Sequence, residues 1–297
     1  MQRRLKKLSM KNNFYKMNKQ IYLRIFFLFI LFIFLLVRCQ KEVTNIKLPE
    51  TNPKLVAGCF ISPQDTLIVV TLTRSNPIFG SGHNSSNNSF VTDASVIISN
   101  GINAVAVPYN NTNWQYELQA SAFPVLSGKT YYLNISTPKG ENVSARCAVP
   151  PSNLSSMTID FIDTTSSEQK INVKWTDIPN QINYYRVFAQ TVMQDSFMND
   201  TTYFEMYSDN SLQNDNEKDG QEMSSKLNAY SSYGGTNNII GYDFYLLNID
   251  EEYYKYYRSL ENFSYGDPFS EPSPLYTNIN GGLGVFAAYQ KIHVRKN

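Results

Sequence analysis

The sequence has few of the side chains that hydrolases and metalloenzymes use. It holds two histidines, three cysteines and two tryptophans among 297 residues. His83 lies in a Gly/Ser/Asn-rich stretch and His293 in the basic C-terminal segment, so neither is in a context that positions it. A Ser-His-Asp triad needs a positioned histidine, and the chain has no HExxH, no CxxC pair and no P-loop. The sequence therefore predicts no enzyme of these kinds and no cofactor.

The chain also has no apolar run of the ~20 residues that cross a bilayer. The run from Ile25 to Val37 has 13 residues and follows a basic segment, as in a secretory signal peptide. Arg38-Cys39 ends this run, and a cysteine at that place predicts attachment of lipid such as palmitate. We therefore predict a signal peptide over 1–38, with Met17 as an alternative start. A tether over 39–53 begins at lipidated Cys39.

The basic leader hides the charge of the rest of the chain. Nine of the 26 Lys and Arg residues lie in the first 38 positions, which hold no Asp or Glu. The remaining residues carry 17 basic and 25 acidic side chains, a net charge of −8 against +1 for the whole chain. Because proteins bind nucleic acid by neutralising phosphates with Lys and Arg, this charge argues against a nucleic-acid partner.

Composition and turn signals predict a mainly β fold. Short β-branched and aromatic runs alternate with Asn, Ser and Gly, which favour turns. Asn100-Gly101 between two apolar runs predicts a hairpin, since a type I′ turn needs positive φ at both central residues. Pro150-Pro151 predicts a boundary between a β-sandwich at 54–150 and a β-rich domain at 151–297, both immunoglobulin- or fibronectin-like. One helix is expected near 250–262, capped by Asp250.

Two cysteines remain once Cys39 is assigned to the lipid. Export would place Cys59 and Cys147 in a compartment where a disulfide persists, and a bridge would close an 88-residue loop. The alternative is two buried free thiols, because cysteine packs as a small apolar side chain.

Four tyrosines crowd the expected helix and are candidates for a ligand or partner surface. They are Tyr253, Tyr254, Tyr256 and Tyr257. Tyrosine is amphipathic and enriched at interfaces. Alternatively, positions 253, 257 and 260 have the helical spacing of a buried face.

Two further segments resemble ligand-binding loops. Asp215, Glu217 and Asp219 match the first half of a calcium loop, but its twelfth position is Lys226 in place of a bidentate glutamate. A solvated acidic turn is the alternative, and no metal is predicted. The glycine-rich segment 280–284 resembles a phosphate loop without the strand-turn-helix unit around it. We predict a tight backbone passage beside the core there.

Motifs spread along the chain carry a family resemblance. They include Leu55-Val56-Ala57-Gly58, Asp93-Ala94-Ser95-Val96, Gly128-Lys129-Thr130-Tyr131-Tyr132-Leu133, Asn183-Tyr184-Tyr185-Arg186, and a block from Asp267 to Phe286 with Asn278, Gly281, Gly282 and Gly284. Together they resemble the Bacteroidota lipoproteins catalogued as domain of unknown function family 4249. The resemblance implies an outer-membrane lipoprotein and, since such proteins are often encoded beside TonB-dependent receptors, an accessory role in uptake. Arg38 departs from the small residue expected before a lipidated cysteine.

These observations lead to three functional hypotheses. The first is a non-enzymatic, lipid-anchored binding or accessory subunit of a TonB-dependent uptake system, on either side of the outer membrane. The second is a surface adhesion or glycan-binding structural module without a transporter. The third is an enzyme on a β-sandwich, such as a glycosidase with carboxylates like Asp160 and Asp163 facing one cleft.

Overall fold

The computed structural model describes most of the chain after residue 51. The described residues are 24, 26–31, 52–76, 90–151, 154, 156–163, 168–195, 200–208, 210–230, 237–263 and 274–297. The chain divides into two units, Met1–Glu50 and Thr51–Asn297. In the first unit, residues 26–31 are helical and nearly all exposed. Cys39, His83 and Asp267 lie outside the described residues, so the lipid anchor stays a prediction. No helix in the described ranges has both the length and the apolar character needed to cross a membrane.

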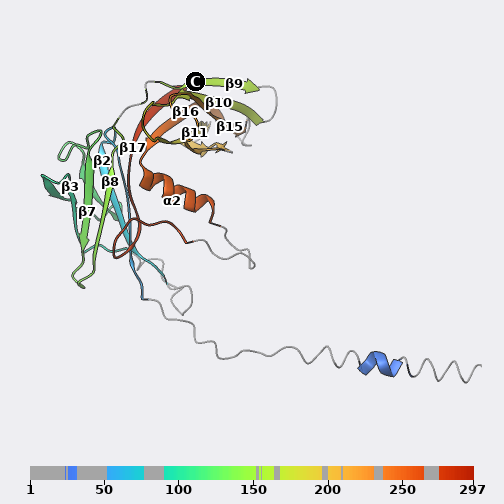
Figure 1. The fold of residues 1–297 in the computed structure, drawn as a ribbon, viewed down its shortest axis with the longest axis horizontal. Coiled ribbons are helices and arrows are strands. Elements are labelled where there is room, and N and C mark those ends of the chain that lie inside the picture. Colours follow the sequence, from blue (N-terminus) through green and yellow to red (C-terminus); the bar gives the residue numbers. More distant parts are fainter. Residues whose placement is uncertain are drawn as a thin grey trace, which may run out of the picture. The chain divides into compact units, whose positions relative to one another are not determined.

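The second unit is mainly β, which confirms the predicted class (Figure 1). Its elements in chain order are β1 (Leu55–Ile61), β2 (Leu67–Arg74), β3 (Ser95–Ser99), β4 (Ala104–Ala106), β5 (Tyr109–Asn110), β6 (Gln115–Gln119), β7 (Thr130–Ser136), β8 (Asn142–Ala148), β9 (Thr158–Asp163), β10 (Glu168–Thr176), β11 (Tyr184–Asp195), β12 (Thr201–Glu205), β13 (Tyr207–Ser208), β14 (Leu212–Asn214), β15 (Glu222–Tyr230), β16 (Asn237–Ile249), α2 (Glu251–Glu261) and β17 (Leu283–Lys296).

The described strands form three sheets. A nine-stranded sheet has the order β12-β11-β16-β17-β1-β2-β6-β5, with β14 also paired to β11. Two four-stranded sheets have the orders β13-β15-β10-β9 and β4-β3-β7-β8. The pairing of β1 with β17 is parallel, and the other strand pairs of these sheets are antiparallel.

Strand β17 joins the two halves of the nine-stranded sheet (Figure 1). Its first part, 283–288, pairs with residues 56–61 of β1. Its second part, 289–296, pairs with residues 242–249 of β16. Strands from both sides of the boundary predicted at residue 150 therefore belong to one sheet, completed by the last strand in chain order.

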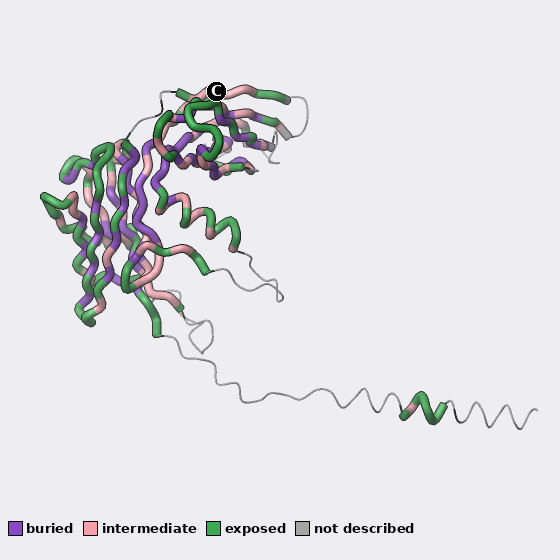
Figure 2. Tube along the Cα trace, viewed as in Figure 1, coloured by how far each residue is buried: buried purple, intermediate pink, exposed green. Residues whose placement is uncertain are grey.

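Alternating side chains of the strands form the buried clusters, and β17 is buried on both faces, with Phe286 and Ala288 in one cluster and Val285 and Ala287 in another. In β7, Tyr131, Leu133 and Ile135 are buried and the residues between them are exposed, as the alternating pattern predicted. One cluster of buried side chains includes residues of β1, β2, β3, β7 and β8. A second includes residues of β10, β11, β15 and β16. Figure 2 shows this burial running along the strands, while the outer side of α2 is exposed.

The predicted helix forms at the expected place. Asp250 is its N-cap, and its carboxylate accepts a hydrogen bond of 2.9 Å from the backbone N–H of Tyr253. Glu251 and Glu252 lie in the first turn, where the helix dipole favours anions. The helix packs on the nine-stranded sheet against Leu247, Val285 and Ala287.

The hairpin at Asn100-Gly101 forms with a longer turn than a type I′ turn. β3 and β4 pair through Ser99 and Ala104, which leaves four residues between them. Gly101 has a φ of +86°, while Asn100 does not have a positive φ. The Asn100 side chain instead accepts hydrogen bonds from the backbone N–H groups of Ile102 and Asn103. The turn therefore has a positive φ at Gly101 and a side-chain hydrogen-bonded Asn100, in place of the two positive φ angles of a type I′ turn.

Candidate functional site

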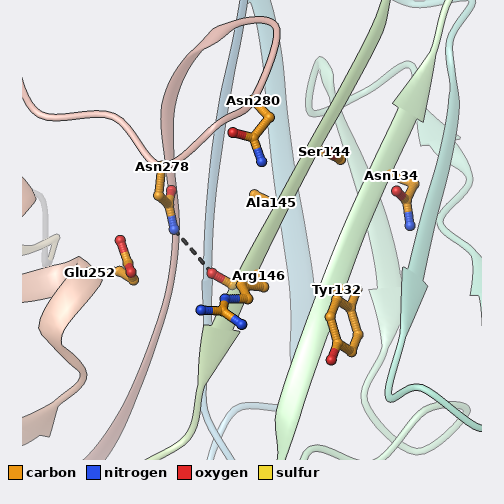
Figure 3. Close-up of a pocket in the computed structure, with 8 residues that line it drawn as sticks. All are labelled: Tyr132, Asn134, Ser144, Ala145, Arg146, Glu252, Asn278 and Asn280. Carbon is orange, nitrogen blue, oxygen red and sulfur yellow. Dashed lines mark hydrogen bonds between the residues drawn. The ribbon is translucent and has the colours of Figure 1, made fainter.

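An open, polar cavity of about 420 Å³ lies on the outer side of the β4-β3-β7-β8 sheet (Figure 3). Its size is within the range of about 300–1,000 Å³ that small-molecule sites occupy. β7, β8, α2 and the segment before β17 line it, through Tyr132, Asn134, Ser144, Ala145, Arg146, Glu252, Asn278 and Asn280. The cavity thus unites segments that are far apart in the sequence.

Strand register sets four of these side chains next to one another. Tyr132 on β7 lies opposite Arg146 on β8, and Asn134 lies opposite Ser144. Successive side chains of a strand point to opposite faces. These four therefore share the outer face, while Leu133 between Tyr132 and Asn134 is buried in the core.

The segment before β17 forms a fixed wall of the cavity. The Asn278 side chain accepts a hydrogen bond from the backbone N–H of Phe286 and donates to the Phe286 carbonyl, at 2.9 and 2.7 Å. It also donates to the Arg146 carbonyl at 3.1 Å, the bond drawn in Figure 3. Asn280 exchanges two backbone hydrogen bonds with Ser144. These hydrogen bonds hold the wall to β8 and β17.

Glu252 from α2 also lines the cavity, and its carboxylate is held. The Tyr276 hydroxyl donates a hydrogen bond of 2.6 Å to Glu252. Burial of Tyr276 and this hydrogen bond raise the pKa of its hydroxyl. The Arg146 guanidinium is exposed and forms no hydrogen bond or ion pair with any residue that the structure describes. The cavity therefore has fixed walls and a free cation beside Tyr132.

The glycine-rich segment forms a tight backbone passage rather than a phosphate loop. A Cβ atom on Gly281 would lie 2.7 Å from the carbonyl oxygen of Asn142. A Cβ on Gly282 would lie 2.7 Å from that of Leu55, and one on Gly284 would lie 2.0 Å from that of Ala57. Gly281 and Gly284 also have positive φ angles, of +81° and +105°. These glycines let the chain cross β8 and β1 closely enough to start β17.

Replacing Asn278 by alanine is expected to lower the free energy of unfolding by about 2–3 kcal/mol. The change leaves the N–H and C=O of buried Phe286 without their partner, and a buried polar group without a partner costs about 1–3 kcal/mol. Urea unfolding followed by circular dichroism measures the difference. Asn280→Ala is the matched control and should stay within about 0.5 kcal/mol of wild type, as exposed side chains do. Equal losses in both variants would contradict the bridging role.

The four helix tyrosines pack on the nine-stranded sheet. Tyr253 is 4% exposed, and the other three are half-buried. Tyr253 stacks on Tyr257 with ring centroids 4.6 Å apart, and Phe60 of β1 contacts Tyr253 edge-on. Arg186 donates to the Tyr253 hydroxyl at 2.7 Å and lies 4.1 Å from the Tyr257 ring centroid. Leu260, expected in the buried face, is 37% exposed. These contacts favour the packing interpretation of the tyrosines over an open stacking surface.

An aromatic ladder, made of Phe188, Tyr245 and His293, crosses β11, β16 and β17 on the same sheet. Each ring stacks on the next with centroids 4.7 Å apart. The His293 Nε2 atom lies 2.8 Å from the Asp243 carboxylate, which also accepts a hydrogen bond from Arg295. The expectation that His293 lacks a fixed position was therefore wrong, because strand register places Phe188, Tyr245 and His293 directly opposite one another.

Three carboxylates gather near the end of β10, but they are not the predicted calcium set. The oxygens of Asp177, Asp215 and Asp219 lie within 4.8 Å of one another. Glu217 is not in this group. Asp215 is buried, so the alternative of a solvated acidic turn does not describe it. Sequence spacing missed Asp177, which lies 38 residues before Asp215.

Hydrogen bonds engage the two buried carboxylates of this group. Asp177 accepts from the Tyr185 hydroxyl at 2.6 Å and from the Gly220 backbone N–H at 2.7 Å. Asp215 accepts from the backbone N–H of Asn183 at 2.9 Å. Oxygen ligands of this kind suit divalent cations, but these contacts make the group a clamp that joins two turns to the start of β11.

Cys59 and Cys147 are free thiols in this structure. Both are buried in the same cluster of side chains, on β1 and β8. Burial raises the pKa of both thiols. The bridge stays a prediction from the sequence. Thiol titration of the unfolded, non-reduced protein decides between the two states. A disulfide bridge leaves no reactive thiol at positions 59 and 147, whereas free cysteines give two.

The carboxylates named for the enzyme hypothesis lie on β9. Asp160 forms an ion pair of 2.9 Å with Lys174 on the neighbouring strand. The side chain of Asp163 lies outside the described residues. The pair of carboxylates facing one cleft therefore stays a prediction.

A comparison of the sequence with protein-family models finds a matching family. The family described as Domain of unknown function (DUF4249) matches residues 41–293. The match includes the cavity, the glycine-rich passage and the helix tyrosines. The search of curated proteins gave no match.

Proposed function

We propose that this chain, which belongs to the DUF4249 family, is a lipid-anchored binding subunit of the outer membrane that serves a TonB-dependent uptake system. The observation that carries the proposal is the cavity with fixed walls and free polar side chains. A pocket whose walls are held before a ligand arrives loses less entropy on binding. The proposal assigns binding, and no catalysis, to this cavity.

The leader supports the membrane attachment. The apolar run from Ile25 to Val37 is followed by Cys39, and the family match begins at residue 41. The first strand, β1, begins at Leu55. The tether proposed over 39–53 would therefore connect the lipid to the first strand. The family resemblance to Bacteroidota lipoproteins, and their association with TonB-dependent receptors, supplies the choice of partner.

We also propose that each half of the second unit is an immunoglobulin-like sandwich. The β4-β3-β7-β8 sheet shares a buried cluster with β1 and β2, at one end of the nine-stranded sheet. The β13-β15-β10-β9 sheet shares another with β11 and β16, at the other end. Two separate cores on one long sheet support this division.

A pull-down from native outer membranes tests the proposed function. Tagged full-length protein in mild detergent should recover a TonB-dependent receptor in near-stoichiometric amount, identified by mass spectrometry. The matched control is Cys39→Ala, which should lose fatty-acid labelling and leave the membrane fraction. Repeated recovery of the protein without a receptor would count against the uptake role, and unchanged labelling of Cys39→Ala would refute the anchor.

The second candidate is a surface adhesion or glycan-binding module that acts without a transporter. The exposed Tyr132, Asn134 and Asn280 of the cavity favour it as much as they favour an uptake subunit. Recovery of the protein alone, together with a gene far from any receptor gene, would select this function.

A further inference from the structure

We infer that the cavity bounded by Tyr132, Arg146 and Glu252 binds a short, neutral oligosaccharide. The inference rests on the proposed binding function and names the ligand class of its cavity. Three properties of the lining support it: the side chains that have no protein partner, the hydrogen-bonding groups that these side chains offer, and the sum of the charges.

The lining excludes an apolar ligand. Small-molecule pockets that bind drug-like ligands are lined mainly by hydrophobic side chains. Here the lining has three asparagines, a serine, an arginine and a glutamate, and its aliphatic member is Ala145. A ligand that fills this space must itself offer hydrogen-bonding groups over most of its surface.

The free side chains point to a polyhydroxylated ligand. Asn278 and Glu252 are engaged in building the walls. Within the described part of the chain, the side chains of Asn134, Asn280 and Arg146 have no protein partner. Each asparagine amide both donates and accepts, which matches the mixed donor and acceptor character of sugar hydroxyls.

Tyr132 supplies the apolar surface that a sugar ring needs. It is 39% exposed and lies on the outer face of β7 (Figure 3). Its ring also lies beside the β3–β4 turn, because a Cβ atom on Gly101 would be 3.7 Å from the Tyr132 Cε2 atom. A tyrosine ring combines an apolar body with a polar hydroxyl. It can therefore contact the C–H groups of a sugar while neighbouring amides bind its hydroxyls.

The charges of the cavity favour a neutral ligand. Arg146 and Glu252 are the charged residues of the lining, so it carries one positive and one negative side chain. A phosphate or a densely sulfated chain would meet one cation and one anion, whereas anion sites gather several cationic or N–H donors. We therefore assign a neutral sugar chain rather than a polyanion.

Binding to defined sugars tests the inference. The full-length protein, in a detergent without a sugar headgroup, is titrated by calorimetry with cellotetraose, maltotetraose, mannotetraose and xylotetraose. At least one should bind. Tyr132→Ala and Asn134→Ala should each weaken that binding by about tenfold or more, equivalent to about 1.4 kcal/mol. Tyr132→Phe, which keeps the ring, should bind within about threefold of wild type.

Controls separate the site from the fold. Tyr207→Ala changes a tyrosine that is 65% exposed on β13, in another sheet, and should leave binding unchanged. Thermal unfolding of Tyr132→Ala should match wild type. Absence of binding by all four sugars, or equal binding by wild type, Tyr132→Ala and Asn134→Ala, overturns the inference. A receptor recovered by the pull-down when no sugar binds would overturn only the ligand class and leave the proposed function standing.

Discussion

Replacing Gly284 by alanine is expected to lower the free energy of unfolding by about 3 kcal/mol or more. Gly284 has a φ of +105°, which L side chains rarely adopt, and an added Cβ would lie 2.0 Å from the Ala57 carbonyl oxygen. That oxygen belongs to the backbone of β1, which pairs with β17 at this position. The methyl group therefore cannot be accommodated by a rotamer change, and the two strands must separate.

Gly58→Ala is the matched control because Gly58 lies in the same strand pair. An added Cβ at Gly58 has no neighbour within 4 Å, so the change should stay within about 0.5 kcal/mol. Urea unfolding measures both variants. Should Gly284→Ala be too unstable to purify, Gly282→Ala gives a second measure, since its Cβ would lie 2.7 Å from the Leu55 carbonyl oxygen. Variants at 284 and 282 as stable as Gly58→Ala would show that β17 does not pair with β1 in this way.

Raising the pH from 5 to 8 is expected to lower the free energy of unfolding by about 2–3 kcal/mol through Asp250 alone. Burial raises the pKa of this carboxyl to about 7, against about 3.9 in an unfolded chain. The folded protein therefore holds the proton more tightly than the unfolded chain. The resulting stability is fully present below about pH 4 and is lost as the pH rises through 7.

Asp250→Asn isolates this effect, because an amide does not titrate. The variant should show a smaller fall between pH 5 and 8, measured by urea unfolding at each pH. Glu141, paired with Arg74, adds no slope in this window because that pairing lowers its pKa to about 2. A pH dependence as steep in Asp250→Asn as in wild type would contradict the assignment.

Local patterns predicted what depends on neighbours in the sequence. The α2 cap at Asp250, the alternation of β7 and the close passage at Gly284 each follow from a few adjacent residues. The parallel pairing of β1 with β17 did not follow, because Val56 and Leu283 are 227 positions apart and parallel pairing leaves no turn signal. A strand pattern shows which face is buried but not which strand lies beside it.

The candidate site was missed for the same reason. Its residues stand at 132–146, 252 and 278–280, and none belongs to a short motif with known chemistry. Asn278 was noticed only as part of a family motif, and its side chain proves to bridge β17 and β8. His293 was set aside as part of a basic tail, yet strand register stacks it on Tyr245. The register between distant strands decides such contacts, and the residue pattern of one strand does not reveal that register.

The position of β17 has a consequence for quality control in the cell. Residues 283–288 cover one edge of β1, and residues 289–296 cover one edge of β16. A chain that stops short of residue 283, through truncation or proteolysis, would expose both edges together. Unpaired strand edges are templates for pairing with other chains, so such fragments would aggregate rather than persist as half-folded monomers. One strand therefore covers two strand edges. Both edges stay unpaired until residues 283–296 have been synthesised and have joined the sheet.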